Sequence, residues 1–344
     1  MADISERQKL ILVLVIRDFI ETAQPVGSRR LVEKFNLDFS SATVRNEMAD
    51  LTEMGYLRQP HTSAGREPTE EGYRYFVRQL MGHTDLPIEI KRTITHQFYQ
   101  ARHDVDQWMR LAASVLAHQS QAASLVTAPH PEKARFKHLE LISTLGRQVL
   151  MVLVLTGGEV RQQMLVLAEP VSQEQLSAVA LEVNERCQGM DAESLSLLTG
   201  QANTLEQDIL KLITEEMERS SAILGGEVYR DGLTNVLAEP EFAETDGARQ
   251  ALKVFEERSL LEDLLTRTIL TSSVGGVQVL IGGEDTWEEL RQCSMVLARY
   301  GAPGLATGTV GVLGPIRMAY GRTISTVRFV AGLLSDLVVD LHGE

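Results

Sequence analysis

Two groups of β-rich segments stand on either side of a long helical block, and this alternation limits the fold more than any other feature of the sequence. The block covers residues 191–270, and its composition is almost wholly typical of helices. The flanking segments, short and rich in Val, Leu and Ile, are 136–143, 148–155, 160–167, 277–281, 294–300 and 309–313. Strands on both sides of a helical block indicate one α+β domain that carries an insertion. Helices over 172–187 and 320–338 complete this expected pattern.

The first 81 residues are expected to form short helices separated by sharp turns. Asn36 and Gly55 follow the second and third of these helices, where a left-handed residue commonly ends a helix. Residues 88–127 are also expected to be mostly helical. The expected N-terminal caps are Asp3 or Ser5 for a helix to about Thr22, Ser28 for 29–35, Ser40 or Ser41 for a helix through Met54, and Thr69 for a helix through Met81.

The third of these helices has a face suited to contact with DNA bases. Its inward stripe is Val44, Met48 and Leu51, spaced at i, i+4 and i+7. Small residues on the opposite arc permit close approach to a groove, Arg bonds guanine, Asn bonds adenine, and an Ala methyl touches the thymine methyl. That arc holds Ala42, Arg45, Asn46 and Ala49. An ordinary solvated face is the alternative.

A polar loop follows, at the position of a wing beside such a helix. Residues 56–59 and 67–69 are expected to form short strands around residues 60–66. His61, Thr62 and Ser63 offer hydrogen-bond donors to phosphates, and Arg66 is expected at the tip as a cation for phosphates or a minor groove. A plain loop histidine is the alternative for His61. Together with the helices, this pattern predicts a winged helix-turn-helix.

The predicted DNA contacts therefore come from three places in the first 81 residues. Arg45 and Asn46 are expected to contact bases, whereas Ser28, Thr43, Thr62 and Ser63 are expected to hold phosphates. The full predicted set is Ser28, Arg29, Ser41, Ala42, Thr43, Arg45, Asn46, His61, Thr62, Ser63 and Arg66.

Charge and composition agree with a DNA-binding unit on an acidic body. Of the net charge of −14, residues 1–80 contribute only −1, because they contain 11 Lys or Arg and 12 Asp or Glu. An acidic remainder resists nonspecific adhesion to DNA, although it could serve solubility alone. Two cysteines fit a reduced, cytoplasmic compartment. The longest apolar runs have seven residues, too few for a membrane span of about 18, and no signal peptide is expected.

Motifs of catalysis and cofactor binding are missing from the sequence. It holds no Walker A motif, nucleophile elbow, His-Glu-x-x-His or Cys-x-x-Cys, so we expect no enzyme, no cofactor and no metal. Gly304, Gly308 and Gly311 have the wrong spacing for a dinucleotide loop. Arg317, which follows Gly314-Pro315, is either a ligand anchor or a turn arginine paired with an acidic group.

Several motifs closely resemble the HrcA family of bacterial heat-inducible transcription repressors. The most specific are PVGSR at 25–29, SSATVRNEM at 40–48 and PHTSAGR at 60–66. The resemblance continues through PT at 68–69, GYR at 72–74, YRDGL at 229–233, PEF at 240–242, IGGE at 281–284 and GVLGPIRM at 311–318. It therefore spans almost the whole sequence.

The resemblance implies a repressor that silences chaperone operons from an inverted repeat in double-stranded DNA. It implies a homodimer kept active by the chaperonin, with a GAF-like domain interrupted by a dimerising insert. The expected domains are a winged helix over 1–81, a linker with connecting helices over 82–127, the GAF-like domain over 128–190 and 271–344, and the insert over 191–270. We expect the helices of 191–270 to dimerise because they have no other evident task.

Two other classes of function are weighed against this one. In the first, the GAF-like domain binds a metabolite and the protein is a ligand-sensing regulator. In the second, an enzyme carries a DNA-binding tail, but the sequence offers no catalytic constellation for it. Stabilisation by a ligand would favour the first alternative, and measurable turnover the second.

Overall fold

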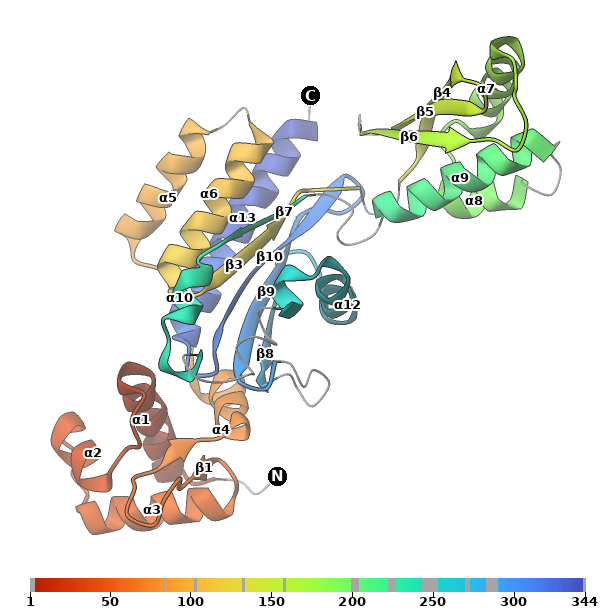
Figure 1. Ribbon diagram of the computed structural model, residues 1–344. Helices are drawn as coiled ribbons and strands as arrows, with labels where there is room; N and C mark the ends of the chain where they lie inside the picture. Colours follow the sequence, from red (N-terminus) through yellow and green to blue (C-terminus); the bar gives the residue numbers. More distant parts are fainter. Residues whose placement is uncertain are drawn as a thin grey trace. The chain divides into compact units, whose positions relative to one another are not determined.

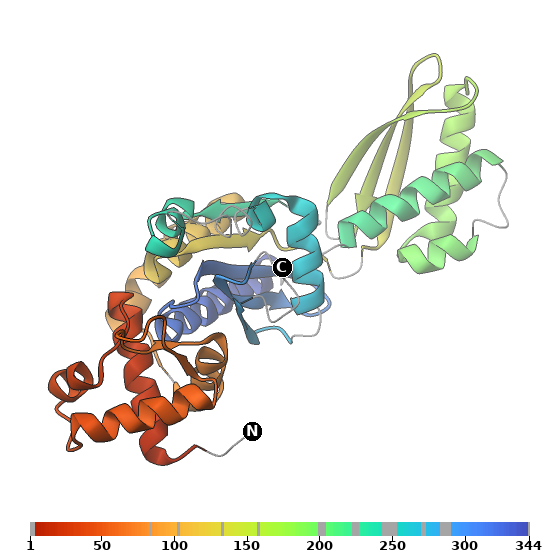
Figure 2. The same cartoon turned by 60° about the horizontal axis from the view of Figure 1, so that its bottom comes forward.

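The computed structural model shows a mixed α+β protein with several sheets, divided into two compact units. It describes residues 4–82, 84–101, 104–131, 134–156, 159–198, 204–221, 227–242, 253–269, 273–282 and 290–342. The first unit comprises Met1–Thr127, Val228–Tyr300 and Thr309–Leu334. The second comprises Ala128–Glu227, Gly301–Gly308 and Ser335–Glu344. Figures 1 and 2 give two views of the ribbon.

The N-terminal segment of the first unit packs three helices around a small apolar core, beside a two-stranded hairpin. Ser5 and Gln8 form a reciprocal cap at the start of α1, and Asn36 ends α2 with a φ of 48°. Core residues from all three helices are fully buried, among them Leu12, Leu31 and Val44. The elements are α1 Glu6–Thr22, α2 Ser28–Phe35, α3 Ser41–Glu53, β1 Leu57–Arg58, β2 Glu67–Pro68, α4 Glu70–Tyr75 and the π-helical segment η1 Phe76–Leu80.

The helix positions expected in this segment are confirmed, with one wrong cap. Ser40 caps α3, Thr69 caps α4, and Gly55 has the left-handed φ of 84° that suits a helix end. Ser28 does not cap α2, because it is the first helical residue and Gly27 occupies the cap position without a side-chain bond. Gly27 has the extended backbone of an N-cap residue, and glycine is among the residues favoured at that position.

A five-stranded sheet forms the body of the first unit, in the order β7-β3-β10-β9-β8. Every residue of β3 and β10 is buried, because helices cover both faces. Figure 1 shows α5, α6 and α13 on one side of this sheet and α12 on the other. The strands are β3 Ala123–Thr127, β7 Val228–Asp231, β8 Val277–Ile281, β9 Cys293–Ala302 and β10 Ala306–Pro315. The helices are α5 Ile88–Gln100, α6 Val105–Ser120, α10 Leu233–Leu237, η3 Pro240–Phe242, α12 Arg258–Ile269 and α13 Tyr320–His342.

The second unit is built on an antiparallel sheet in the order β4-β5-β6. Along β5, buried residues alternate with half-buried ones, so one face of the sheet lies on a core. Helices α7 and α9 supply the other side of that core with Leu176, Val183, Ile209 and Met217. The elements are β4 Phe136–Leu145, β5 Gln148–Leu155, β6 Val160–Val166, α7 Gln173–Cys187, α8 Ala192–Leu198 and α9 Thr204–Ser221.

The expected strands are present, but they divide between two sheets. Strands β4 to β6 pair only with one another among the described residues, and the units separate near residues 127 and 227. The expected boundaries, a GAF-like domain over 128–190 and 271–344 and an insert over 191–270, therefore differ from the observed ones. Residues 88–127 are mostly helical, as expected, but they end in strand β3, and strand β7 interrupts the helices expected over 191–270. Such short apolar runs do not distinguish strand from helix until tertiary pairing is known.

No helix among the described residues is long and apolar enough to cross a membrane.

Candidate nucleic-acid interface

Helix α3 presents one face to the core and another to solvent, as its periodicity predicts. Val44, Met48 and Leu51 are buried against the other helices of the segment. Arg45 and Asn46 are exposed, and neither makes a side-chain hydrogen bond or ion pair with any residue that the structure describes. A guanidinium and an amide that have no partner in the described part of the chain are available to an external ligand.

The N-cap of α3, Ser40, fixes the position of Thr43 at the start of this helix. The Ser40 hydroxyl accepts from the Thr43 backbone N–H at 3.1 Å and contacts the Thr43 hydroxyl at 2.9 Å. Thr43 is half-buried, whereas Ser41 and Ala42 are exposed. Positively polarised backbone N–H groups at this helix start favour a nearby anion.

Helix α2 carries two further predicted residues, Ser28 and Arg29. Arg29 is exposed and pairs with Glu33 one turn later, at 2.8 Å. Ser28 is buried, with 8% of its surface exposed, so its hydroxyl points away from bulk solvent. Its buried side chain is therefore poorly placed for the phosphate contact expected from the sequence.

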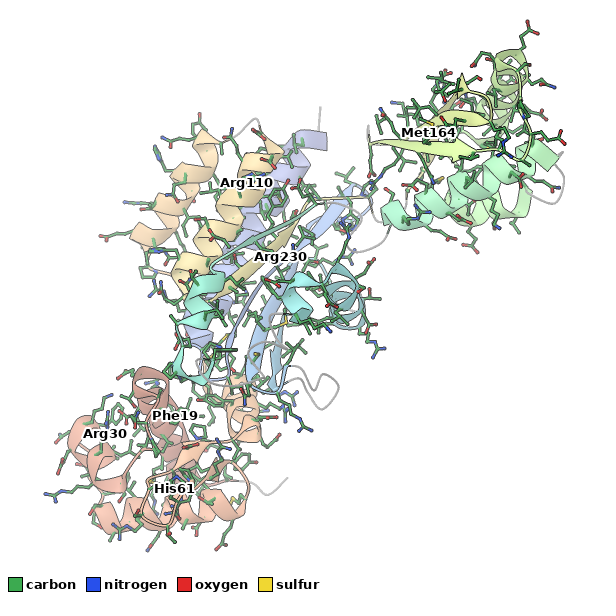
Figure 3. All side chains as sticks on the ribbon, viewed as in Figure 1. Phe19, Arg30, His61, Arg110, Met164 and Arg230 are labelled. Carbon is green, nitrogen blue, oxygen red and sulfur yellow. The ribbon has the colours of Figure 1, made fainter. Side chains whose placement is uncertain are left out.

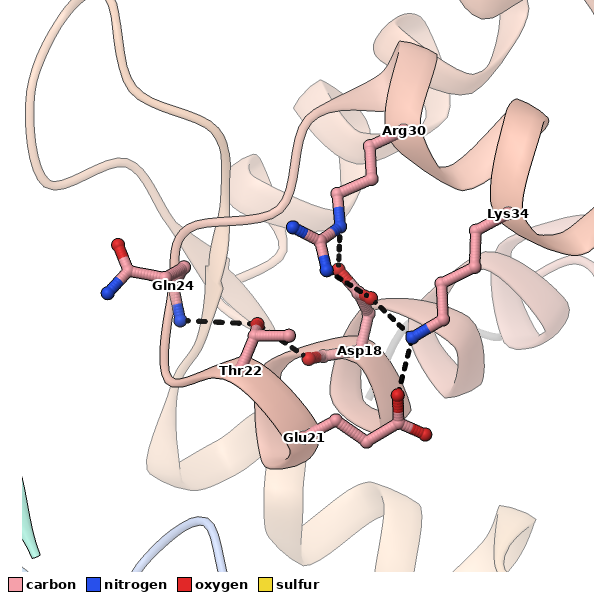
Figure 4. Close-up of polar contacts among 6 residues, drawn as sticks. All are labelled: Asp18, Glu21, Thr22, Gln24, Arg30 and Lys34. Atoms are coloured by element: carbon pink, nitrogen blue, oxygen red, sulfur yellow. Dashed lines mark hydrogen bonds and ion pairs between the residues drawn. The ribbon is translucent and has the colours of Figure 1, made fainter.

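A buried carboxylate, Asp18 of α1, holds α2 in place, and sequence reasoning missed it (Figure 4). Arg30 pairs with Asp18 at 2.8 Å, and Lys34 bonds Asp18 at 2.8 Å and Glu21 at 2.5 Å. The hydrogen bonds to Asp18 and Glu21 raise the pKa of Lys34. The sequence does contain a signal for this buried carboxylate. Asp18 lies seven residues after Ile11, so the helical period places it on the inward, buried stripe of α1.

The hairpin loop after α3 is compact and exposes the three predicted polar residues. The Gln59 side-chain amide donates to the carbonyls of Thr62 and Ala64, each at 3.0 Å. These bonds hold the loop in a defined shape. The side chains His61, Thr62 and Ser63 remain exposed, and Figure 3 labels His61.

Arg66 does not lie at the tip of this loop, contrary to the expectation. Its backbone exchanges two hydrogen bonds with Val26, at 2.8 and 2.9 Å, and its Nε donates to the Thr52 hydroxyl at 2.9 Å. Neighbouring Gly65 has no room for a side chain, because a Cβ would lie 2.4 Å from the Val26 carbonyl. Arg66 is therefore at the base of the hairpin, where backbone pairing holds it beside α3.

Comparison with known proteins identifies the family. Residues 106–324 match the family model described as the HrcA protein C terminal domain. The heat-inducible transcription repressor HrcA of Roseiflexus castenholzii is 46% identical, over 99% of this chain and 96% of that protein. The corresponding repressor of Herpetosiphon aurantiacus is 43% identical, over 99% of this chain and 97% of that protein. A crystal structure titled as that of a hypothetical protein shares the fold, with 23% identity, a TM-score of 0.56 and 98% coverage of each chain.

These relatives define the class as transcription repressors, which is not a class of enzymes. The chain belongs to the HrcA family of heat-inducible transcription repressors.

Proposed function

We propose that this protein represses heat-shock chaperone operons by binding an inverted repeat in double-stranded DNA as a homodimer. The observation that carries the proposal is the outward face of α3, where Arg45 and Asn46 are exposed and have no side-chain partner among the described residues. In this proposal α2 and α3 form the helix-turn-helix, and the hairpin of β1 and β2 is the wing.

The interface divides into base contacts and phosphate contacts. Arg45 and Asn46 contact base edges in the major groove, and the exposed methyl of Ala42 contacts a thymine methyl. The phosphate contacts are Ser41, Thr43 and Arg29 beside the helix starts, the backbone of Ser28, and His61, Thr62 and Ser63 of the loop. Arg66 is held at the hairpin base by the bond of its Nε to Thr52, and in this proposal its terminal N–H groups contact a phosphate.

The second unit supplies the dimer contact in this proposal, through its open sheet face rather than its helices. Helices α8 and α9 do have another task, because their apolar residues fill the core of their own unit. On the opposite face of the sheet, Ile142, Leu150 and Met164 lie in register across the strands. Ile142 is 45% and Met164 53% exposed, an apolar surface that a second copy would cover.

The body of the first unit is the GAF-like domain of the proposal, and heat acts on folding of the whole chain. The active dimer competes with unfolding and aggregation of a multidomain protein. A chaperonin that refolds the chain raises the active fraction. When heat fills the chaperonin with other clients, the repressor is lost and the chaperone genes are expressed.

Selection of duplexes from a randomised library by the purified chain tests the proposal, followed by footprinting of the recovered sequence. We expect an inverted repeat protected symmetrically, with affinity that falls when either half is scrambled. Binding that does not depend on sequence, or protection of an asymmetric site, would contradict it.

A further inference from the structure

Arg317 joins three segments that are far apart in the sequence. It lies between β10 and α13, and its guanidinium is mostly buried, with 14% of the side chain exposed. One Nη forms an ion pair with Glu239, just before η3. The other Nη donates to the backbone carbonyl of Ile20 at 3.4 Å. A planar guanidinium can hold two acceptors in fixed directions, which an ammonium cannot do as well.

The carbonyl of Ile20 belongs to the last turn of α1, which ends at Thr22. Carbonyls of a last helical turn lack partners within the helix and carry the negative end of its dipole. Helix α1 has no basic residue of its own in that turn. Arg317, contributed by the body of the first unit, therefore supplies the cation and the donor at the end of this N-terminal helix.

A second contact lies on α4, beside a cavity of about 720 Å³. Arg74 donates to the carbonyl of Ile281 at the end of β8, at 3.0 Å. The rings of Tyr73 and Tyr320 pack in a tilted arrangement with centroids 5.9 Å apart, and both rings are buried. The cavity is lined by Phe19 of α1 as well as by Arg74 and Arg317, and Figure 3 labels Phe19. The N-terminal segment thus meets the sheet body at Arg317, at Arg74 and at the buried pair of tyrosines, around this cavity.

We propose that Arg317 is a positioning residue that sets the orientation of the N-terminal segment on the sheet body, and with it the half-site spacing that the dimer accepts. This inference rests on the proposed function, because it assumes that two copies bind two half-sites. Arg317 contacts the end of α1 and does not lie on α3. Replacing it is therefore expected to leave the contact of one copy with a single half-site unchanged. In a dimer, the distance between half-sites follows from the orientation of the two DNA-binding segments.

The experiment compares full-length Arg317→Ala and Glu239→Gln with the unchanged chain. The probe is the inverted repeat that the unchanged chain selects from a random duplex library, with repeats of altered spacer length and an isolated half-site. We expect the affinity of both variants for the repeat to fall at least about tenfold. Affinity for the isolated half-site is expected to stay unchanged, and the preference among spacer lengths to broaden. Arg267→Ala is the matched control, because Arg267 makes an exposed ion pair with Asp263 on α12.

The outcomes separate this inference from the proposed function. If the unchanged chain selects no inverted repeat, the proposed function fails. If it selects one and both variants keep its affinity and spacing preference, the positioning role is overturned. An equal loss on repeat and half-site also overturns it, since that pattern indicates a general folding or DNA-binding defect. Glu239→Gln keeps the size of the side chain, so it provides the measurement if Arg317→Ala does not fold.

Discussion

Arg45 and Asn46 are available to an external ligand because the opposite face of α3 is buried in the core. Val44, Met48 and Leu51 bind α3 to the core, and this leaves the two polar side chains pointing outward on a rigid support. Arg30 and Lys34 on α2 show the contrasting case, since both are tied to Asp18. A count of cations in the first 80 residues therefore overstates the number that can meet DNA.

Replacing Arg45 tests the assignment of base contacts. We expect Arg45→Ala to weaken binding to the selected repeat by roughly 1–3 kcal/mol and to relax the preference at one base position. Fluorescence anisotropy on a set of single-base variants measures both effects. An equal loss on the repeat and on random DNA would reassign Arg45 to phosphate contact.

Replacing Asp18 tests the support beneath α2. Asp18→Asn removes a carboxylate that is 1% exposed and accepts from two cations, so we expect the free energy of unfolding to fall by roughly 1–3 kcal/mol. Glu21→Gln is the matched control, because Glu21 binds the same Lys34 but is 63% exposed, and its loss should cost about 0.5 kcal/mol or less. Urea titration gives both values, and equal effects would argue against a special role for the buried position.

Among the elements, the hairpin of β1 and β2 depends on close backbone approach more than on strand length. Each strand has only two residues, and the bridge from Arg66 to Val26 adds the pairing that anchors the loop. We expect Gly65→Ala to destabilise the fold by roughly 1–3 kcal/mol, because the new methyl would overlap the Val26 backbone. Gly332→Ala in α13 has open space and should instead stabilise by about 0.5–1 kcal/mol. Thermal melts of the two variants should shift in opposite directions, and a common direction would contradict the packing argument.

At the scale of the whole molecule, the proposal that the exposed face of the β4-β5-β6 sheet forms the dimer contact can be tested by substitution. Met164→Lys places a charge within the proposed dimer contact, so we expect sedimentation to show monomers at concentrations where the unchanged chain is dimeric. Leu181→Lys on α7 is the control, since Leu181 is also exposed but lies outside that sheet face. If Met164→Lys remains dimeric, the contact lies elsewhere.

Heat control is a second property of the whole molecule. If folding limits activity, purified chaperonin with ATP should raise the DNA-binding fraction of heat-treated protein without changing its base preference. The active fraction is obtained by titrating the repeat at protein concentrations well above the dissociation constant. Full activity after heating in dilute solution without chaperonin would favour control by a ligand.

Local chemistry made much of this protein predictable. Serine and threonine caps, left-handed Asn36 and Gly55, and the periodicity of α3 depend on residues within a few positions of each other, so helix limits and the outward Arg45 and Asn46 follow from sequence. Pairing between distant segments does not. Whether β4 joins β9 or β5, whether Arg66 stands at a tip or a base, and which carboxylate binds Arg317 are settled by contacts across tens to hundreds of residues. Short apolar strands fit several partners equally well, and burial in one particular core selects among them.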